Sequence, residues 1–248
     1  MTTVYTPQFL DTLKKKPQEA QTSTPRAEEP HHDRIQEVKN PDGRLIMKVP
    51  YKGDKINGTY EAYHPETGQL MQTIQYVEGV MEGMMTAYDG QKQMTHQIPY
   101  VAGKKEGLAH FFINGSKVSE IPYKDDQMDG AATFFAPGGS IRAIIGYKNN
   151  MMDGDFTAYD PAHKVLKKCG YIQGKQDGPC KQFYPSGKVF EESVYKEGLL
   201  QGEVKKYQEN GTPLEIATYN DQGQMVSQEK FDMKGQSLGK QEVGQSHG

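Results

Sequence analysis

The chain is poor in the residues that several common protein classes need. It has no tryptophan, only two cysteines in 248 residues, and a formal net charge of −3. Such a charge gives no sign of the basic stripe that nucleic-acid binders carry, so no nucleic-acid partner is expected. With 35% hydrophobic residues and a mean hydropathy of −0.80, the composition argues against a thick globular core.

Long apolar stretches are also missing. No run approaches the ~20 residues of a membrane-spanning helix. The amino terminus has no apolar core of the kind found in signal peptides. The cytoplasm is therefore the expected compartment, and membrane contact is possible at a surface but is not favoured.

The two cysteines, Cys169 and Cys180, lie in neighbouring segments. A hairpin that turns about Lys175 and Gln176 places Tyr171 opposite Cys180. Cys169 then lies one diagonal step away from Cys180, which is too far for the geometry of a disulfide. Two reduced thiols are therefore predicted, in agreement with a reducing compartment.

Motifs for catalysis are missing as well. The recurrent G-x-x-x-G strings lack the lysine, the spacing and the helix of a phosphate-binding loop. None of the seven histidines shows the spacing of a metal site, and no serine stands in a G-x-S-x-G elbow. No catalytic, cofactor-binding or metal-binding residue is predicted, so the chain is expected to be no enzyme and to use no cofactor.

What the chain does have is a repeat. One unit reads YIQGKQDGPCKQFYPSG over residues 171–187, and near copies of it run through most of the sequence. A fixed period of this size indicates an array in which each unit packs on its neighbours. The opening tyrosines recur every 23 to 25 residues, at Tyr51, Tyr76, Tyr100, Tyr123, Tyr147, Tyr171, Tyr195 and Tyr219.

Each unit predicts two short strands joined by a turn. An apolar or small residue usually stands two places before the tyrosine, and this spacing puts both side chains on one face of a strand. The third residue after the tyrosine, where the turn begins, is usually glycine, asparagine or aspartate, as at Gly174, Asn150 and Asp126. These residues tolerate positive φ, so the exchange indicates a requirement of the backbone rather than of catalysis.

An aromatic residue follows the second glycine of seven units by five places, which predicts an aromatic ladder along the array. One interpretation is packing between units, which predicts that Phe135→Ala costs roughly 3–5 kcal/mol. The other is a recognition stripe for a peptide or a partner's helix, because exposed tyrosines are good anchors. The ladder consists of Tyr63, Tyr88, Phe112, Phe135, Tyr159, Phe183 and Tyr207.

The pattern Y-x-x-G-x-x-x-G-x-x-x-x-[YF]-x-x-x-G, as in YVAGKKEGLAHFF and YKEGLLQGEVKKYQENG, resembles MORN repeats. It is most similar to the variant form found in bacterial proteins that often carry an antitoxin label. The resemblance covers residues 35–235 and implies an all-β fold, an elongated single-sheet array of stacked β-hairpins. It also implies protein binding, scaffolding or occasional lipid contact, with no common chemistry.

The two ends of the chain fall outside the repeat. Residues 1–34 contain four prolines and no glycine, and they are predicted to be mostly disordered. Within them a short helix is predicted over residues 7–16, and it docks either on the first repeat or on a partner. Residues 236–248 are predicted to be a flexible tail. The apolar face of the helix consists of Phe9, Leu10 and Leu13.

These features predict a non-catalytic scaffold that binds another protein. It would act as an adaptor, a chaperone or an immunity-like, antitoxin-like accessory protein in a bacterial cytoplasm, and the identity of its partner stays open. The alternative is a structural scaffold that contacts lipid through a basic edge near the turns. That edge would consist of Lys52, Lys55, Lys104, Lys105, Lys148, Lys175 and Lys196.

Overall fold

The computed structural model describes residues 33–243. The predicted helix over residues 7–16, with Phe9, Leu10 and Leu13, lies outside the described residues. Every regular element between residues 33 and 243 is a β-strand. This part of the chain accordingly contains no helix that would be long and apolar enough to cross a membrane.

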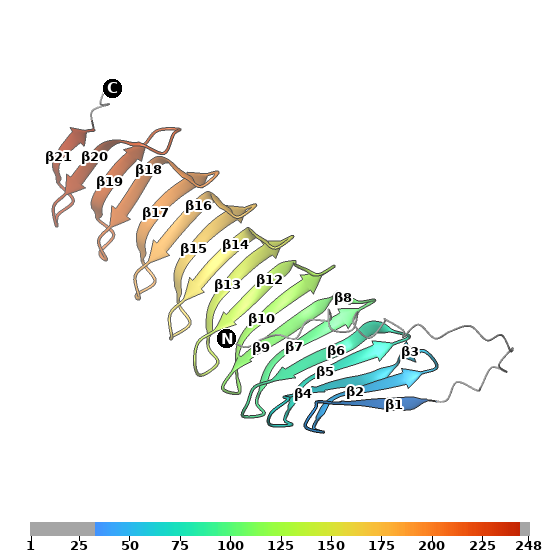
Figure 1. Cartoon of the computed structure of the whole chain (residues 1–248). Helices are drawn as coiled ribbons and strands as arrows, with labels where there is room; N and C mark the ends of the chain where they lie inside the picture. The colour runs from blue at the N-terminus through green and yellow to red at the C-terminus, as the bar shows by residue number, and fades with distance from the viewer. Residues whose placement is uncertain (1–32, 244–248) are drawn as a thin grey trace, which may run out of the picture. The chain divides into compact units, whose positions relative to one another are not determined.

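The strands form one open antiparallel sheet of 21 strands, in which successive hairpins follow one another along the chain (Figure 1). The predicted all-β array of hairpins is confirmed. The first strands are β1 (Arg34–Lys39), β2 (Leu45–Lys52), β3 (Lys55–Ile56), β4 (Gly58–Tyr63), β5 (Leu70–Val77), β6 (Val80–Tyr88), β7 (Met94–Val101), β8 (Lys104–Lys105), β9 (Gly107–Ile113) and β10 (Ser116–Lys124). The others are β11 (Gln127–Met128), β12 (Gly130–Phe135), β13 (Ile141–Lys148), β14 (Met151–Tyr159), β15 (Val165–Ile172), β16 (Lys175–Phe183), β17 (Val189–Lys196), β18 (Leu199–Tyr207), β19 (Pro213–Tyr219), β20 (Met225–Phe231) and β21 (Ser237–Glu242).

Each repeat unit contains an incoming strand, which carries the tyrosine, and an outgoing strand. A two-residue turn joins them, and in the unit of β15 and β16 it consists of Gln173 and Gly174. Both residues have positive φ, 48° and 83°, as a type I′ hairpin requires. Asp126 and Asn150, which stand where other units have glycine, have φ of 69° and 66°. The predicted backbone requirement is therefore confirmed.

The second glycine of each unit forms a bulge in the outgoing strand. Across β15 and β16, Tyr171 faces Gln176 and Cys169 faces Cys180. Between these two pairs, three outgoing residues centred on Gly178 oppose a single incoming residue. The second glycines of the seven units have φ between 65° and 115°, a region that favours glycine. The bulge bends the strand and thereby curves the sheet.

The prediction of two reduced thiols is wrong. The turn lies at residues 173–174 rather than at 175–176, and the bulge adds two residues to the outgoing side. Both shifts together place Cys169 directly opposite Cys180, with their Cα atoms 4.0 Å apart, and the two side chains form a disulfide. The error arises because a simple hairpin register does not allow for the bulge.

Proline divides three of the outgoing strands. Where the residue before the tyrosine is Pro50, Pro99 or Pro122, the outgoing segment is split into a two-residue strand and a longer one. The split strands are β3 and β4, β8 and β9, and β11 and β12. Proline has no N–H to donate to the ladder, so pairing is interrupted beside it. Units without this proline keep a nine-residue outgoing strand, as in β6, β14, β16 and β18.

The core of this single layer is one row of side chains that crosses the strands. Neighbouring members face each other, as Ile74 faces Met85 and Phe156 faces Cys169. Val49 and Ala109 are 0% exposed. Partly buried side chains such as Tyr100 and Tyr123 pack against the cluster that contains Ala109. The strands bend and the sheet twists along its length (Figure 1). The core row consists of Val49, Tyr60, Ile74, Met85, Ile98, Ala109, Ile121, Ala132, Ile145, Phe156, Cys169, Cys180, Ser193, Val204 and Ala217.

The sheet continues past the predicted end of the array. The flexible tail predicted over residues 236–248 includes β21, which pairs with β20. The prediction is wrong for this strand. β21 has glutamine at the core-row position, where Gln241 faces Gln228, and it has no tyrosine, so the repeat pattern does not reveal it. Residues 244–248 lie outside the described residues.

Candidate binding surfaces

The predicted aromatic ladder lies on the face of the sheet opposite to the core row. Phe135 follows the core-row residue Ala132 by three places on β12, and this odd spacing sends the two side chains to opposite faces. All seven ladder side chains are partly buried, whereas Ala132 is 0% exposed. The ladder is therefore not the most buried part of the array.

Charged side chains surround the ladder. The ammonium of Lys117 lies 5.2 Å from the ring centroid of Phe135. The Tyr207 hydroxyl donates to Glu192 Oε2 over 3.2 Å, and the Tyr63 hydroxyl donates to Glu61. Burial, together with the hydrogen bond and the charge of Glu61, raises the pKa of Tyr63 to about 12. The ladder is thus a mixed aromatic and charged surface, rather than a bare aromatic stripe.

The repeat tyrosines share the face of the core row and pack there. Tyr76 is 5% exposed and packs edge-to-face against Tyr60, with ring centroids 6.3 Å apart. Burial raises the pKa of both phenols and that of Tyr100. These tyrosines are therefore packing residues of the array, and their phenols are protonated at neutral pH.

A regular series of exposed aliphatic side chains flanks the tight turns. Val77 faces Val80 across the turn between β5 and β6, and Val101 and Ile172 occupy equivalent positions in later units. These four side chains are between 44% and 54% exposed. Lysines hold many of the other equivalent positions. We call this set the tip row: Lys52, Lys55, Val77, Val80, Val101, Lys104, Lys124, Gln127, Lys148, Met151, Ile172, Lys175, Lys196 and Leu199.

The basic edge predicted from the sequence lies largely in the tip row. Six of its seven lysines flank a tight turn there. Lys105 does not, because it faces Tyr100 across the strand pair, and its ammonium lies 5.2 Å from the ring centroid of Tyr123. Sequence reasoning missed the aliphatic members, although they recur one and four places after the repeat tyrosine.

Hydrogen bonds between units hold the tips in place. The Gly103 N–H donates to the carbonyl oxygen of Met81 over 2.9 Å. Beside it, the Ala102 N–H donates to Glu82 Oε2 over 2.7 Å. The side-chain bond recurs because the residue before the second glycine is an acid or an amide, a signal that the sequence contains but that sequence reasoning missed. Its acceptors are Asn57, Glu82, Glu106, Asp153 and Asp177.

Acidic residues of the turns neutralise part of the charge of the tip row. Lys55 Nζ lies 3.1 Å from Glu78 of the next turn, and Lys104 Nζ lies 2.7 Å from Asp125. The hydrogen bond to Asp125, followed by its charge, raises the pKa of Lys104, and the same contact lowers the pKa of Asp125. The tips therefore combine aliphatic groups with charges of both signs.

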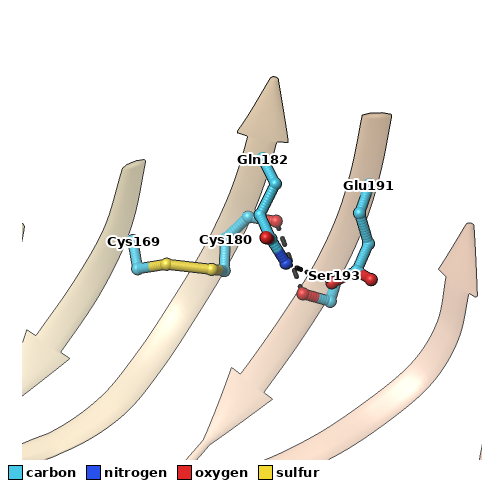
Figure 2. Close-up of a disulfide and its surroundings, with 5 residues drawn as sticks. All are labelled: Cys169, Cys180, Gln182, Glu191 and Ser193. Carbon is cyan, nitrogen blue, oxygen red and sulfur yellow. Dashed lines mark hydrogen bonds between the residues drawn. A yellow bond between two sulfur atoms is a disulfide. The ribbon is translucent and has the colours of Figure 1, made fainter. Parts of the chain in front are cut away.

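The disulfide lies in the core row, where other units have apolar pairs. Cys169 and Cys180 are 1% and 4% exposed. Figure 2 shows the bond bridging β15 and β16, with Ser193 of β17 on the far side of Cys180. The Ser193 hydroxyl donates to the carbonyl oxygen of Cys180 over 3.4 Å, and Gln182 Nε2 donates to Glu191 over 2.9 Å. The bridge therefore stabilises the hairpin and is shielded from solvent.

Within residues 33–243, no group of three or more histidine, cysteine, aspartate or glutamate side chains has the arrangement of a metal site. The predicted site residues of the ladder are spread evenly along the sheet, one in each unit, rather than gathered in one place. The structure thus offers extended surfaces as the candidates for function.

Comparison with protein families identifies part of the array. Residues 176–197 and 200–221 each match the model of the MORN repeat variant. Residues 176–221 are MORN-variant repeats. They run from β16 to just past β19, and the earlier units from Tyr76 onward have the same turn, bulge and core-row position as these MORN-variant repeats. The unit of Tyr51 differs in its turn, where only Gly53 has positive φ. MORN repeats are scaffolds that generally carry no catalytic site, and no enzyme family was found.

No curated protein matches this chain. Among solved structures, one described as "Crystal Structure of TcdB2-TccC3-Cdc42" aligns with 80% of this chain at 9% sequence identity and a TM-score of 0.21. The alignment spans only 13% of that much longer protein.

Proposed function

We propose that this chain is a non-catalytic repeat scaffold that binds another protein. Its role would be that of an adaptor, a chaperone or an immunity-like, antitoxin-like accessory protein of a bacterium. The observation that supports this function is the tip row, in which exposed apolar side chains recur at equivalent places on five of the seven tight turns. Exposed apolar groups that are contiguous along a surface are a common mark of interaction sites.

The construction of the tips favours binding. Backbone and side-chain hydrogen bonds join each turn to the one before it, as Gly103 joins Met81 and Ala102 joins Glu82. A surface fixed in advance loses little conformational entropy when a partner docks. Because the tips recur with the period of the repeat, one partner can contact several of them at once.

The chemistry of the tip row indicates what the partner's surface would be like. Lysines such as Lys148 and Lys196 stand beside aliphatic groups such as Met151 and Leu199. A complementary surface would present apolar side chains flanked by carboxylates. Acidic turn residues such as Glu78 would disfavour a uniformly anionic partner.

The proposal can be tested by affinity capture from the native host with variants of the full chain. The triple substitution Val101→Ser, Ile172→Ser and Leu199→Ser removes aliphatic groups from the tip row. The matched control is Ile113→Ser, which removes an aliphatic group that is 62% exposed beside the turn of Asn114 and Gly115, at the opposite end of β9 from the tip row. We expect a partner that is captured by the wild-type chain and the control and is lost with the triple variant. Loss with both, or with neither, would contradict binding at the tip row.

Contact with an anionic lipid surface is the second candidate, and the lysines of the tip row favour it. The ion pairs Lys55–Glu78 and Lys104–Asp125 weigh against it, because they reduce the positive charge of the edge. Sedimentation with phosphatidylserine vesicles and with phosphatidylcholine vesicles separates the two functions. Lipid contact predicts binding to the anionic vesicles alone, falling steeply as salt rises. A protein-binding scaffold sediments with neither.

The disulfide bears on where the scaffold works. Disulfides persist in oxidising compartments and are rare in a reducing cytoplasm. We therefore propose that the chain works in an oxidising compartment, in place of the cytoplasm expected from the sequence. The test is to quench thiol exchange with acid in an extract of the native host, alkylate the free thiols, and identify the state of both cysteines by mass spectrometry. An intact disulfide between Cys169 and Cys180 is expected. Alkylated thiols would instead support the cytoplasmic location expected from the sequence.

A further inference from the structure

Within residues 33–243, each end of the sheet is a strand with one unpaired edge, and the two edges are of complementary kinds. β1 is an outgoing strand that pairs with the incoming strand β2. β21 is an incoming strand that pairs with the outgoing strand β20, and within the described residues no outgoing strand follows it. All residues of β21 are exposed, and in β1 only Val38 is partly buried. The sheet would continue beyond β21 with an outgoing strand, and β1 is an outgoing strand.

On the face opposite to the core row, the side chains next to the two edges carry charges of opposite sign. At the β1 end, Glu37 faces Lys48, whose ammonium lies 3.9 Å from Glu61 on β4. At the β21 end, Glu229 faces Lys240. A pairing that sets Lys240 against Glu37 of another molecule would continue this alternation of acid and base. Opposite charges that face each other across strands stabilise a strand pair.

The same register aligns the two ends of the core row. Gln36 faces Val49 at one end, and Gln241 faces Gln228 at the other. In an antiparallel pair, the residue numbers rise along one strand as they fall along the other. Pairing Lys240 with Glu37 therefore also pairs Gln241 with Gln36. Each carboxamide has donors and an acceptor, so the two glutamines can hydrogen-bond to each other.

We propose that this chain associates end to end, with β21 of one molecule pairing antiparallel with β1 of a second copy. The unpaired N–H and C=O groups of the two edges would supply the hydrogen bonds, as in other cases of strand addition. The contact joins two different edges, so it leaves a free edge at each end and allows further copies to add. The surface involved is distinct from the tip row, and the proposal does not rest on the partner proposed above.

Pairing between two identical edges fits the side chains less well. β1 against β1 in the core-row register sets Glu37 against Ile35, which offers no base. β21 against β21 sets Lys240 against Glu242, but Lys240 Nζ already lies 2.9 Å from Glu242 Oε1 of its own chain. A closed dimer through β21 is therefore the competing outcome.

The test is the molar mass of the full chain in solution, measured by light scattering over a range of concentrations at low and high salt. The charge reversals Glu37→Lys and Lys240→Glu are made singly, and the two single variants are also mixed. Lys196→Glu, a reversal at a tip of β17, away from both edge strands, is the matched control. Thermal melts of every variant report whether the fold is intact.

We expect the wild type and the control to grow in mass with concentration beyond a dimer, and less so at high salt. Each single variant should stay at the monomer mass of 27.8 kDa, because like charges then meet at the contact. The equimolar mixture should associate again, because the unchanged Lys240 of the Glu37→Lys variant meets the unchanged Glu37 of the Lys240→Glu variant. The two substituted side chains, which also carry opposite charges, meet at the next contact. Rescue by mixing is not expected of variants that have merely lost stability.

Two results would overturn the proposal. One is a wild-type chain that stays monomeric at every concentration and salt. The other is a dimer that does not grow, that is lost with Lys240→Glu but not with Glu37→Lys, and that mixing fails to restore. This second result would identify pairing of two β21 strands instead.

Discussion

Side chains that are only three residues apart have different environments in this sheet. Ala132 lies in the core row and is 0% exposed, whereas Phe135 lies on the opposite face beside Lys117 and is partly exposed. Residue size is therefore a poor guide to burial here. Small residues such as Ala109 and Ala132 are fully enclosed at 0% exposure.

The first prediction compares the core row with the ladder. Ile98→Ala should destabilise the fold by about 2–5 kcal/mol, because it removes a buried side chain and leaves a cavity. Phe135→Ala should cost less than the roughly 3–5 kcal/mol expected of a buried phenylalanine, because its ring is partly exposed. Urea unfolding of both variants measures the difference. A larger loss for Phe135→Ala than for Ile98→Ala would contradict the placement of the core.

The second prediction concerns His96, which packs against Phe111 with ring centroids 6.1 Å apart. Burial, and then the charge of Lys105, lowers the pKa of His96 from its ordinary value of 6.5. Below pH 6.5 the unfolded chain takes up a proton that the folded chain resists, so stability should fall as the pH drops through this region.

The variant His96→Gln tests this dependence, since Gln72 holds the equivalent position of another unit. Melting temperatures measured as the pH is lowered below 6.5 should fall less for His96→Gln than for the wild type. Parallel curves for the two chains would show that His96 does not carry the effect.

At the scale of the hairpin, one bulge accounts for the curve of the sheet and for the disulfide. The type I′ turn and the second glycine together set which residues face each other, as Cys169 faces Cys180. They also explain why glycine recurs at this place, since each of these glycines has positive φ. The local backbone therefore determines both the register and the chemistry of the unit.

The third prediction compares two second glycines. At Gly130, with φ of 115°, an added Cβ would lie 3.0 Å from Pro122 Cγ, whereas at Gly154, with φ of 97°, it would meet nothing within 4 Å. Both alanine variants should lose at least about 1–2 kcal/mol, because L-residues disfavour positive φ. Gly130→Ala should lose more, as measured by chemical unfolding. Equal losses would show that the contact with proline has no effect.

The fourth prediction concerns the bridge between β15 and β16. Replacing both Cys169 and Cys180 by alanine should destabilise the fold by about 2–4 kcal/mol, because the bridge restricts the unfolded chain. Reductant should lower the melting temperature of the wild type and leave the double variant unchanged. If reductant shifted both chains equally, the bridge would not be the cause.

Much of this hairpin could be predicted from the sequence. The period, the two strands of each unit and the positive φ of Asp126 and Asn150 follow directly from residue types at fixed spacing. The pairing of Cys169 with Cys180 is not predicted, because it depends on a turn at residues 173–174 and on the two extra residues of the bulge, and a simple hairpin register contains neither. The tip row could be predicted only in part, because its lysines stand out as charges, while Val101 and Ile172 resemble ordinary strand residues.

On the scale of the whole sheet, stability is expected to come from contacts between neighbouring units. Each hairpin pairs only with the hairpins before and after it, as β15 pairs with β14 and β16. Energies of such arrays are close to a sum of unit and interface terms. The MORN-variant repeats at residues 176–221 are thus two members of a longer series with one construction.

The fifth prediction follows from this modular construction. Deleting residues 124–147 joins Tyr123 to Lys148 and removes one full period, so the shortened chain should fold and melt cooperatively. Deleting residues 124–135 removes half a period and leaves two incoming strands in succession, which an antiparallel sheet cannot pair through a short turn. This chain should fail to fold by circular dichroism. Equal behaviour of the two deletions would contradict a modular array.

The measurement that tests the proposed function most directly is site-specific photo-crosslinking in the native host. A photoreactive residue is placed at Val101 in the tip row and, in a matched chain, at Ile113, which is more exposed but lies at the opposite end of β9 from the tip row. The account predicts one discrete protein adduct from position 101 and none from position 113. Adducts from position 113 alone, or the same adducts from both, would show that the tip row is not the binding surface.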